Sequence, residues 1–374
     1  MKILLIAEYF KRGGTFKFLL TLIKNHSDLG FNTHLLIEKK QKNNVVIQLC
    51  EKYNAEISYV NNRPILFCKP YASLVYELYI WIVYIRKIKY DILIISNSSP
   101  WMNFSYFLFV KAPIAYFTHC YPDQRLSKKF YLMYILPRFL NGYKKIVAVS
   151  IYGAKQIMLY MDIPKRFIKI IYNSIPIVNL SNNQISHDSI NVLTAGRLSP
   201  IKNPDIWLKV IKYVVRIKPE TTFTWVGGNE AQNLEMYQKI EAENLIEYIS
   251  LVMYKENITE LYKNASIYFQ PSLSENHSIS VIEAMLFGLP CVVSNVGGMS
   301  ESVINNETGF LCDPKDVEGF SDRIVMLIEN KTLAKNLGDT GKLRAKTLFS
   351  EEVQKKEIEK LYITLMNNKE LCTL

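Results

Sequence analysis

Residues Pro271–Glu301 read PSLSENHSISVIEAMLFGLPCVVSNVGGMSE and carry the clearest architectural signal in the chain. Just before them, Ser266–Gln270 is a short apolar run, which predicts a buried strand. Within them, Ser278–Phe287 repeats apolar residues at helical spacing, which predicts a helix. A strand, a polar loop and a helix in this order are typical of a parallel α/β sheet. Ligands of such sheets bind beyond the carboxyl ends of the strands.

Two features of this segment indicate a ligand that carries both a phosphate and neighbouring hydroxyls. The backbone at Ser278, Ile279 and Ser280 begins the expected helix, where free N–H groups and the helix dipole suit a phosphate. Glu275 and Glu283 lie on either side of that point. Because a carboxylate can accept hydrogen bonds from adjacent hydroxyls of a sugar ring, the segment predicts a sugar-nucleotide site.

The size and composition of the chain indicate a two-domain protein. Its 374 residues exceed the usual length of one domain and predict two of about 150–200 residues each. The six cysteines lack metal-ligand spacing, which favours a reducing compartment and argues against zinc and against a disulfide framework. Met1–Phe10 is too short for a signal peptide and is interpreted as a first strand. Ile92–Val110 is interrupted by Asn97–Pro100, so it predicts strand, turn and helix rather than a membrane span. A cytoplasmic protein is expected.

Charge is distributed unevenly along the chain. Residues 1–180 have a net charge of +16, whereas the remainder has −5. The basic half interleaves lysine and arginine with aromatic residues, as in Tyr71–Tyr90 and Lys128–Lys145. Such segments suit the headgroup region of an anionic membrane better than nucleic acid. We therefore expect peripheral attachment to the inner face of the cell membrane, with an ordinary solvated lysine-rich surface as the alternative.

Apolar runs alternate with helical segments, which predicts parallel α/β domains. Residues Asn173–Asp188 are rich in Asn, Ser and Pro and are the best linker candidate. Beyond Phe320 the pattern is helical, ending in an amphipathic helix over Ser350–Asn367. The expected architecture is two Rossmann-like domains that face each other across a cleft. The predicted strands are Lys2–Ala7, Thr33–Glu38, Glu56–Val60, Asp91–Ser96, Pro113–Thr118, Ile146–Ser150 and Ile168–Tyr172, then Ile190–Ala195, Thr222–Val226, Tyr248–Met253, Ser266–Gln270, Cys291–Ser294 and Gly309–Cys312.

Basic residues follow the first strand of the second series. Arg197 comes directly after that strand, and Lys202 follows five residues later, so both side chains can reach one anion. They would neutralise a diphosphate leaving group. Gly297 and Gly298 are expected to form a turn whose backbone a phosphate could approach closely. Glu301 follows them and could equally be an acidic residue that the dipole at the start of a helix favours. The sequence contains no Asp-x-Asp, which favours a mechanism without a metal ion.

The first half offers weaker candidates. Gly13–Gly14 follows the first strand and allows close approach to a ligand, although a plain tight turn is equally compatible. His119 ends a strand and could hydrogen-bond a donor sugar, or could have a structural role. Asp123 and Arg125 follow it and could touch an acceptor. His277 lies in the glutamate loop, where packing could be its whole role.

Taken together, these motifs resemble the group 1 (family 4) retaining glycosyltransferases of the GT-B fold. Each piece alone is common, but their order and spacing are specific, most densely over residues 190–313. The matching pieces are GGTFKFLLTLI, YFTH, VAVS, TAGRLSPIKNPD, FTWVGG, ENITELYKNASIYFQPSLSENHSISVIEAM, GLPCVVSNVGGMSE and NETGFLCDP.

The resemblance implies roles for residues of the second half. Arg197 and Lys202 match the pair that binds the nucleotide diphosphate, and the backbone of Ser278–Ser280 matches the phosphate cradle. Glu283 matches the glutamate that holds the ribose hydroxyls, and Glu275 the one that contacts the donor sugar.

The resemblance also implies a division of the chain. Residues 1–178, joined by the helix 350–374, correspond to the acceptor-binding domain, and 179–349 to the nucleotide-sugar domain. Gly14 matches the flexible loop near donor and acceptor, and His119 the histidine that lines the sugar site. The chain departs from the family where the common E-G-F-G is Glu275–Ser278, ENHS. It also has Met253 in place of a usual glycine and Ser266 in place of a usual aspartate.

The resemblance therefore implies retaining, metal-independent transfer of a hexose from a UDP- or GDP-sugar. The expected acceptor is a lipid-linked sugar or an oligosaccharide in capsule, O-antigen or exopolysaccharide synthesis, with no nucleic-acid partner and no cofactor. A non-catalytic sugar-nucleotide or glycan-binding subunit with the same fold is the main alternative. An NAD-dependent oxidoreductase is a weaker one, since Glu38 ends the second strand but the dinucleotide fingerprint is absent.

Overall fold

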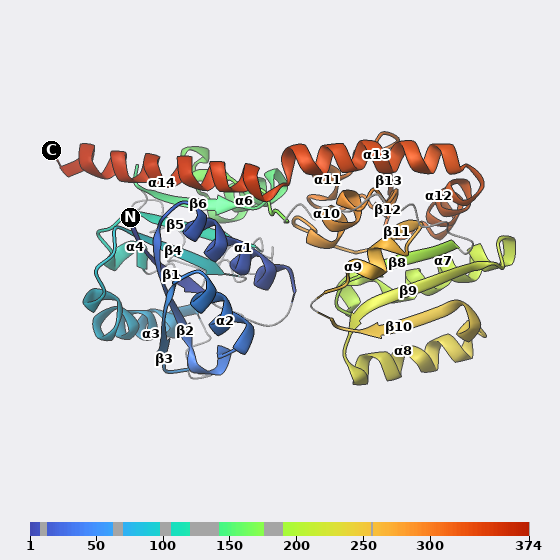
Figure 1. Ribbon diagram of the computed structural model, residues 1–374, viewed down its shortest axis with the longest axis horizontal. Helices are drawn as coiled ribbons and strands as arrows, with labels where there is room; N and C mark the ends of the chain where they lie inside the picture. Colours follow the sequence, from blue (N-terminus) through green and yellow to red (C-terminus); the bar gives the residue numbers. More distant parts are fainter. Residues whose placement is uncertain are drawn as a thin grey trace. The chain divides into compact units, whose positions relative to one another are not determined.

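The computed structural model describes residues 1–7, 13–62, 70–97, 106–119, 142–175, 190–255 and 257–373. They form two compact units (Figure 1). Unit 1 consists of Met1–Ser174 together with Glu351–Leu374, and unit 2 consists of Ile175–Ser350. Each unit is built around a parallel sheet.

Unit 1 contains a seven-stranded sheet in the order β3-β2-β1-β4-β5-β6-β7. Every pair of neighbouring strands is parallel. The direction of strand addition reverses between β1 and β4, which is the switch point where ligands of doubly wound sheets bind. The strands are β1 (Lys2–Ala7), β2 (Asn32–Glu38), β3 (Glu56–Val60), β4 (Ile92–Asn97), β5 (Ile114–Thr118), β6 (Lys144–Ala148) and β7 (Ile168–Ile170).

Helices cover both faces of this sheet because its strands are apolar on both sides. Alternate residues of a strand point to opposite faces, so Ile3 and Leu5 belong to one core and Leu4 and Ile6 to the other. The first core packs against α1 (Gly14–Asp28), α2 (Asn44–Lys52) and α14 (Glu351–Thr373); the second packs against α3 (Pro70–Val83), α4 (Tyr106–Phe109) and α6 (Ile151–Met161).

The last helix, α14, is an integral part of unit 1. Lys24 of α1 forms an ion pair with Glu351 of α14, with Nζ and Oε1 2.6 Å apart. His26 lies buried between Thr33 and Tyr362, with 3.0 Å between its ring nitrogens and each hydroxyl. Burial lowers the pKa of His26 to about 3, so the ring is neutral at physiological pH. These contacts join the end of the chain to its beginning.

Unit 2 contains a six-stranded parallel sheet in the order β10-β9-β8-β11-β12-β13. Its switch point lies between β8 and β11. The strands are β8 (Ile190–Ala195), β9 (Thr221–Gly228), β10 (Ile249–Met253), β11 (Ile267–Gln270), β12 (Cys291–Ser294) and β13 (Gly309–Cys312).

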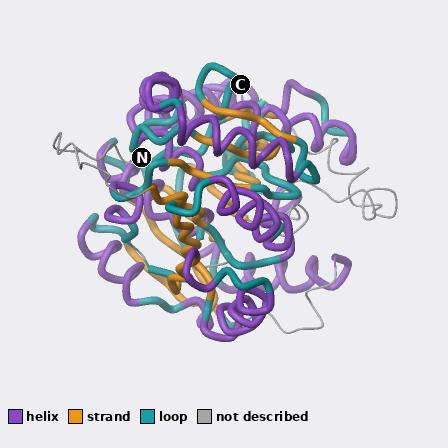
Figure 2. The backbone as a smooth tube through the Cα atoms, turned by 90° about the vertical axis from the view of Figure 1, so that its right-hand side faces the viewer, coloured by secondary structure: helices purple, strands orange, loops and turns teal. Residues whose placement is uncertain are grey.

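The helices of unit 2 also flank their sheet, and Figure 2 shows strands lying between helices. Ile267 and Phe269 of β11 point into the core formed with α7 (Pro204–Ile217), α8 (Glu230–Ala242) and α12 (Val317–Glu329). Tyr268 and Gln270 therefore point to the opposite face, which α10 (Ile279–Leu286) covers. The other helices of unit 2 are α9 (Thr259–Lys263), α11 (Met299–Ser302) and α13 (Lys331–Leu348).

Short helical turns connect elements in both units. They are η1 (Lys39–Gln41), η3 (Ile85–Lys87) and η4 (Lys165–Phe167) in unit 1, and η5 (Pro200–Lys202) and η6 (Ile246–Tyr248) in unit 2.

The predicted α/β class with two Rossmann-like domains is confirmed, and each predicted strand is present. The prediction Ile146–Ser150 was two residues late, because Ser150 caps α6 by accepting a hydrogen bond from the Gly153 N–H at 2.9 Å. The final helix extends beyond the predicted Asn367, to Thr373. Most of the expected linker lies outside the described residues. Among the helices that the structure describes, none has the length and apolarity needed to cross a bilayer.

Candidate functional site

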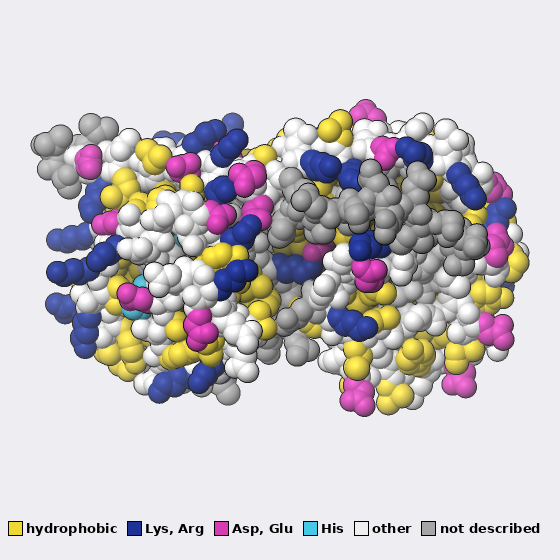
Figure 3. Space-filling view, in the orientation of Figure 1, with side chains coloured by type: hydrophobic (Ala, Val, Ile, Leu, Met, Phe, Trp, Pro, Cys, Tyr) yellow, Lys and Arg dark blue, Asp and Glu magenta, His cyan; other side chains and the backbone are white. Residues whose placement is uncertain are grey.

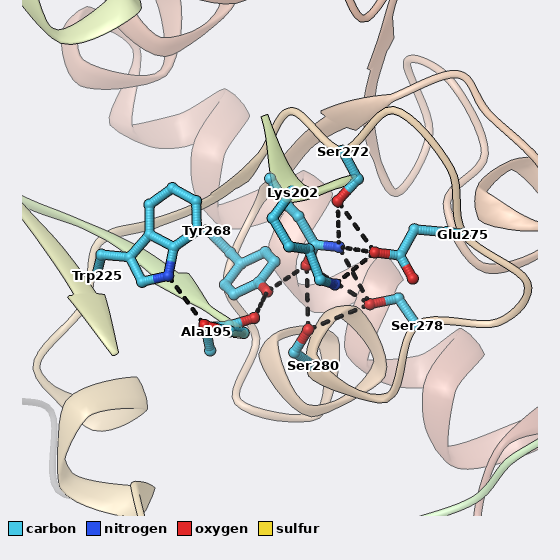
Figure 4. Close-up of polar contacts among 10 residues, drawn as sticks. Ala195, Lys202, Trp225, Tyr268, Ser272, Glu275, Ser278 and Ser280 are labelled. Atoms are coloured by element: carbon cyan, nitrogen blue, oxygen red, sulfur yellow. Dashed lines mark hydrogen bonds and ion pairs between the residues drawn. The ribbon is translucent and has the colours of Figure 1, made fainter. Parts of the chain in front are cut away.

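The loops that follow β8 and β11 lie side by side at the switch point of unit 2 (Figure 4). The Leu273 N–H of the second loop donates to the Ile201 carbonyl of the first, at 2.8 Å. This contact places Lys202, at the end of the first loop, beside the loop that carries Glu275.

An ion pair between Lys202 and Glu275 is central to the site. The Lys202 ammonium contacts Oε1 of Glu275, and both side chains are mostly buried, with 17% and 13% exposed. Gly196 makes room for the lysine, since a Cβ at Gly196 would lie 3.2 Å from Cε of Lys202. Gly196 also has a φ of 157°, which disfavours any other residue. Arg197, next in the chain, is exposed.

Glu275 is held by further donors besides the lysine. Its Oε1 accepts hydrogen bonds from Nε2 of Gln270 at 2.8 Å and from Oγ of Ser272 at 3.0 Å. Gln270 is completely buried, and its amide oxygen accepts from Oη of Tyr268 at 2.6 Å and from Oγ of Ser280 at 3.0 Å. The network therefore connects the Glu275 carboxylate to the beginning of α10.

The beginning of α10 has the properties of an anion site. Ser278 is the N-cap residue, but its side chain makes no capping hydrogen bond within the described chain. Its Oγ instead lies 3.1 Å from Oγ of Ser280. The first turn, which includes Ile279, has no acidic residue. Since the first N–H groups of a helix have no partner within the helix, they can bind a phosphate here.

Glu283 lies further along α10 and is oriented by a buried tyrosine. Oη of Tyr262 donates to Oε2 of Glu283 at 2.9 Å and also lies 3.2 Å from the Ser280 carbonyl. Burial, reinforced by Glu283, raises the pKa of Tyr262 well above its usual value. The phenol thus stays protonated and remains a donor. Its ring stacks on Phe287, with 5.1 Å between the centroids.

The Gly297–Gly298 turn supports the loop of Glu275. Gly297 has a φ of 56°, and a Cβ there would lie 1.8 Å from the Glu275 carbonyl oxygen. The Gly298 N–H donates to that same oxygen at 3.0 Å. The close approach that these glycines permit is therefore to the backbone of Glu275. Glu301 lies in α11, where its carbonyl accepts from Arg344 at 2.7 Å.

His277 contributes packing to the glutamate loop. Its ring lies edge-on to Phe349, with 5.0 Å between the centroids. Burial lowers the pKa of His277 to about 3, so the ring is neutral at pH 7. Met253, one of the departures from the family pattern, is 57% exposed at the end of β10.

Two further predicted residues lie in unit 1. Gly14 is the first residue of α1. His119 follows β5; its Nε2 lies 3.2 Å from Oγ of Ser96, and its ring meets the ring of Phe18, with 4.4 Å between the centroids. Burial lowers the pKa of His119 to about 4, so at pH 7 it can hydrogen-bond a ligand only as a neutral ring. Asp123 and the neighbouring Arg125 lie outside the described residues.

Most of the predicted site residues lie in unit 2, where an ion pair and hydrogen bonds to Gln270 connect Lys202, Glu275, Ser278 and Ser280. The residues placed there are Arg197, Lys202, Glu275, Ser278, Ile279, Ser280 and Glu283. Sequence reasoning missed Tyr262, Gln270 and Ser272. Of these, Gln270 could have been recognised in the sequence, because it is the polar side chain that ends the apolar run IYFQ. Within the described part of the chain, no group of three or more His, Cys, Asp or Glu side chains is arranged to hold a metal ion.

Comparisons with known proteins match both halves of the chain to family models. A family model described as glycosyl transferases group 1 matches residues 179–344, and one described as glycosyltransferase family 4 matches residues 12–178. A curated relative is the Escherichia coli UDP-Gal:alpha-D-GlcNAc-diphosphoundecaprenol alpha-1,3-galactosyltransferase, 30% identical over 192 residues, which are 50% of this chain and 48% of that protein. The chain thus spans about half the length of curated relatives such as this one.

Solved structures resemble the whole chain. A glycosyltransferase from Rickettsia africae superposes with a TM-score of 0.81 at 18% identity, covering 98% of this chain and 99% of that one. Anabaena HepE in complex with UDP-glucose superposes with a TM-score of 0.74 at 20% identity, covering 96% and 99%. At these identities the likeness shows the fold alone.

Proposed function

Because the chain belongs to the group 1, family 4 glycosyltransferases of the GT-B fold, we propose that it transfers a hexose from a UDP- or GDP-sugar. The proposed acceptor is a lipid-linked sugar or an oligosaccharide in surface polysaccharide synthesis. The observation that carries the proposal is the Lys202–Glu275 pair beside the uncapped start of α10. This arrangement offers a cation, a carboxylate and backbone N–H groups at the switch point of one sheet.

The diphosphate of the donor is proposed to bind between the basic residues and α10. Lys202 and Arg197 would neutralise its charge, and the backbone N–H groups of Ser278–Ser280 would bind its oxygens. As the bond between the sugar and the diphosphate breaks, negative charge grows on the leaving group. The same positive groups would stabilise that charge without a metal ion.

The two glutamates are proposed to hold the two sugar rings of the donor. Glu283, fixed by Tyr262, would accept hydrogen bonds from the ribose hydroxyls, and Glu275 would accept from the transferred hexose. The acceptor hydroxyl would attack the anomeric carbon from the face that the diphosphate leaves, which retains the configuration. Its proton would pass to the departing phosphate, so that a nucleoside diphosphate and a glycosylated acceptor form. The solved complex of HepE with UDP-glucose supports the proposal of a UDP-sugar donor.

A donor screen tests this proposal. The purified protein would be incubated with UDP- and GDP-sugars and a polyprenyl diphosphate-linked sugar, with and without EDTA, and products would be identified by mass spectrometry. We expect one donor to support transfer and EDTA to leave the rate unchanged. Loss of activity in EDTA that Mn²⁺ restores would contradict the metal-free mechanism. Donor binding without transfer to any acceptor would favour the non-catalytic subunit instead.

We also infer that unit 1 attaches to an anionic membrane surface. Val75, Tyr79 and Ile82 of α3 are 57%, 40% and 44% exposed, and their spacing places them on one face of the helix. Exposed Arg86 and Lys87 lie in the short turn η3, which follows α3. Apolar and aromatic side chains next to cations suit the headgroup region. Figure 3 shows Lys and Arg side chains gathered along the left-hand edge of this unit in that view.

A further inference from the structure

Gln270 is buried at the switch point of unit 2, although a buried amide is stable only when its hydrogen-bonding groups are satisfied. Its amide oxygen faces two donors, Oη of Tyr268 and Oγ of Ser280. Its Nε2 faces Oε1 of Glu275 and Oγ of Ser272. Both ends of the amide are therefore fully engaged.

The orientation of this amide is determined by Glu275. An ionised carboxylate only accepts hydrogen bonds, so the group that faces it must be the amide nitrogen. The opposite orientation would place two acceptors 2.8 Å apart. Tyr268 supports the observed orientation, because burial raises its pKa well above the usual value and keeps the phenol a donor. Gln270 is thus a fixed donor aimed at the carboxylate.

The donors around Glu275 all lie on the same carboxylate oxygen. Lys202, Gln270 and Ser272 all contact Oε1. In Figure 4 the other carboxylate oxygen of Glu275 carries no dashed line to the residues drawn. Three donors on one oxygen restrict the rotation of the carboxylate and leave its second oxygen without a hydrogen bond from any of the three.

We propose that Gln270 is a positioning residue that holds Glu275 so that Oε2 accepts a hydrogen bond from a hydroxyl of the transferred sugar. This inference rests on the proposed function, because it assigns Glu275 to the donor sugar. This role would explain why a polar residue, Gln270, ends the otherwise apolar strand β11. It also separates recognition of the sugar, through Gln270 and Glu275, from recognition of the diphosphate, which uses backbone N–H groups and Lys202.

The experiment compares two affinities of each variant by calorimetry, for the nucleoside diphosphate alone and for the complete sugar nucleotide. In Gln270→Met, Glu275 loses its amide donor while the backbone groups of α10 remain. We expect the affinity for the sugar nucleotide and kcat/KM to fall at least tenfold, because a hydrogen bond to a charged group is lost. We expect the affinity for the nucleoside diphosphate to change by less than about threefold.

A second variant, Gln270→Glu, gives a pH signature that a purely structural role would not produce. It places a carboxylate against Glu275, and the two repel at pH 8. At pH 6 the facing pair can share one proton, which restores the missing hydrogen bond. The activity of Gln270→Glu relative to the wild type is therefore expected to rise at least threefold between pH 8 and pH 6.

Matched variants keep the inference falsifiable. Gln354→Met removes another buried glutamine, which donates to the Tyr172 carbonyl in unit 1, and should leave both affinities unchanged. If the Gln270 variants do not fold, Ser272→Ala tests the same oxygen of Glu275 and should weaken only sugar-nucleotide binding. Equal losses of both affinities, or no loss of either, would overturn the inference. A wild-type protein that binds no sugar nucleotide would instead overturn the proposed function.

Discussion

The chemistry proposed for this site depends on a few residues, each of which contributes one functional group. Lys202, Glu275 and Glu283 were predicted from the spacing of charged residues along the sequence. Tyr262, which orients Glu283, was not predicted, because it lies in a different helix and its contact depends on how α9 packs against α10. A sequence shows which side chains can do chemistry, but it does not show which neutral side chains support them.

Tyr262→Phe tests this supporting contact. The ring and its stacking on Phe287 are kept, while Glu283 loses its phenol donor. In Tyr262→Phe we expect the affinity for the nucleoside diphosphate to fall about 3- to 10-fold. In Glu283→Ala, which removes the carboxylate itself, we expect it to fall about 10- to 100-fold. Calorimetric titration measures both. Tyr237→Phe, at an exposed tyrosine of α8, is the control and should leave the affinity unchanged. An unaltered affinity in Glu283→Ala would remove this residue from the ribose site.

At the scale of elements, most of the fold could be predicted. Strands such as Lys2–Ala7 and Cys291–Ser294 were placed at their observed limits, because buried parallel strands are continuous apolar runs bounded by polar residues. The role of the Gly297–Gly298 turn could not be predicted. Its glycines are required by the carbonyl of Glu275, which lies twenty-two residues earlier in the chain.

Gly297→Ala should therefore do more than strain one turn. Alanine is disfavoured at a φ of 56°, and its Cβ would overlap the Glu275 carbonyl, so the glutamate loop must move. We expect the free energy of unfolding to fall by more than about 2 kcal/mol, and donor binding to weaken. Gly288→Ala separates the two causes: it also has a positive φ, but its Cβ would meet only Cδ of Lys342 at 3.7 Å. Denaturant titrations that give equal losses for the two variants would contradict this account.

The apolar face of α3 makes a prediction about membrane attachment. Replacing Val75, Tyr79 and Ile82 together by serine should reduce co-sedimentation with anionic vesicles several-fold, because buried apolar area is lost. Raising the salt concentration should also reduce binding of the wild type. Leu159→Ser, at a 69% exposed leucine of α6, is the matched control. If the wild-type protein stays in the supernatant at low salt, it does not bind the vesicles, and the basic residues of unit 1 form an ordinary solvated surface.

At the scale of the whole molecule, buried neutral histidines should make the protein sensitive to acid. The pKa of His26 in unit 1 and of His277 in unit 2 is lowered to about 3 by burial. Between about pH 6.5 and pH 3 the unfolded chain therefore binds protons that the folded chain excludes. The stabilising contribution of each is present above pH 6.5 and is lost as the pH falls, by about 1.4 kcal/mol per unit.

Denaturant titrations at pH 7, 5 and 4 measure this dependence. His277→Phe, which keeps a ring against Phe349 but cannot titrate, should reduce the slope of unfolding free energy with pH for unit 2. An unchanged slope in this variant would mean that His277 is not the group responsible.

The central claim is that this chain transfers a sugar from a nucleotide donor held by Lys202 and α10. The most direct test measures formation of the glycosylated acceptor by the wild type and by Lys202→Met, with the preferred donor. We predict product and nucleoside diphosphate in equal amounts for the wild type, and a rate lower by at least about 100-fold for Lys202→Met, because the leaving group loses a buried cation. Equal rates for the two proteins, or a wild type that forms no product with any donor, would contradict the account.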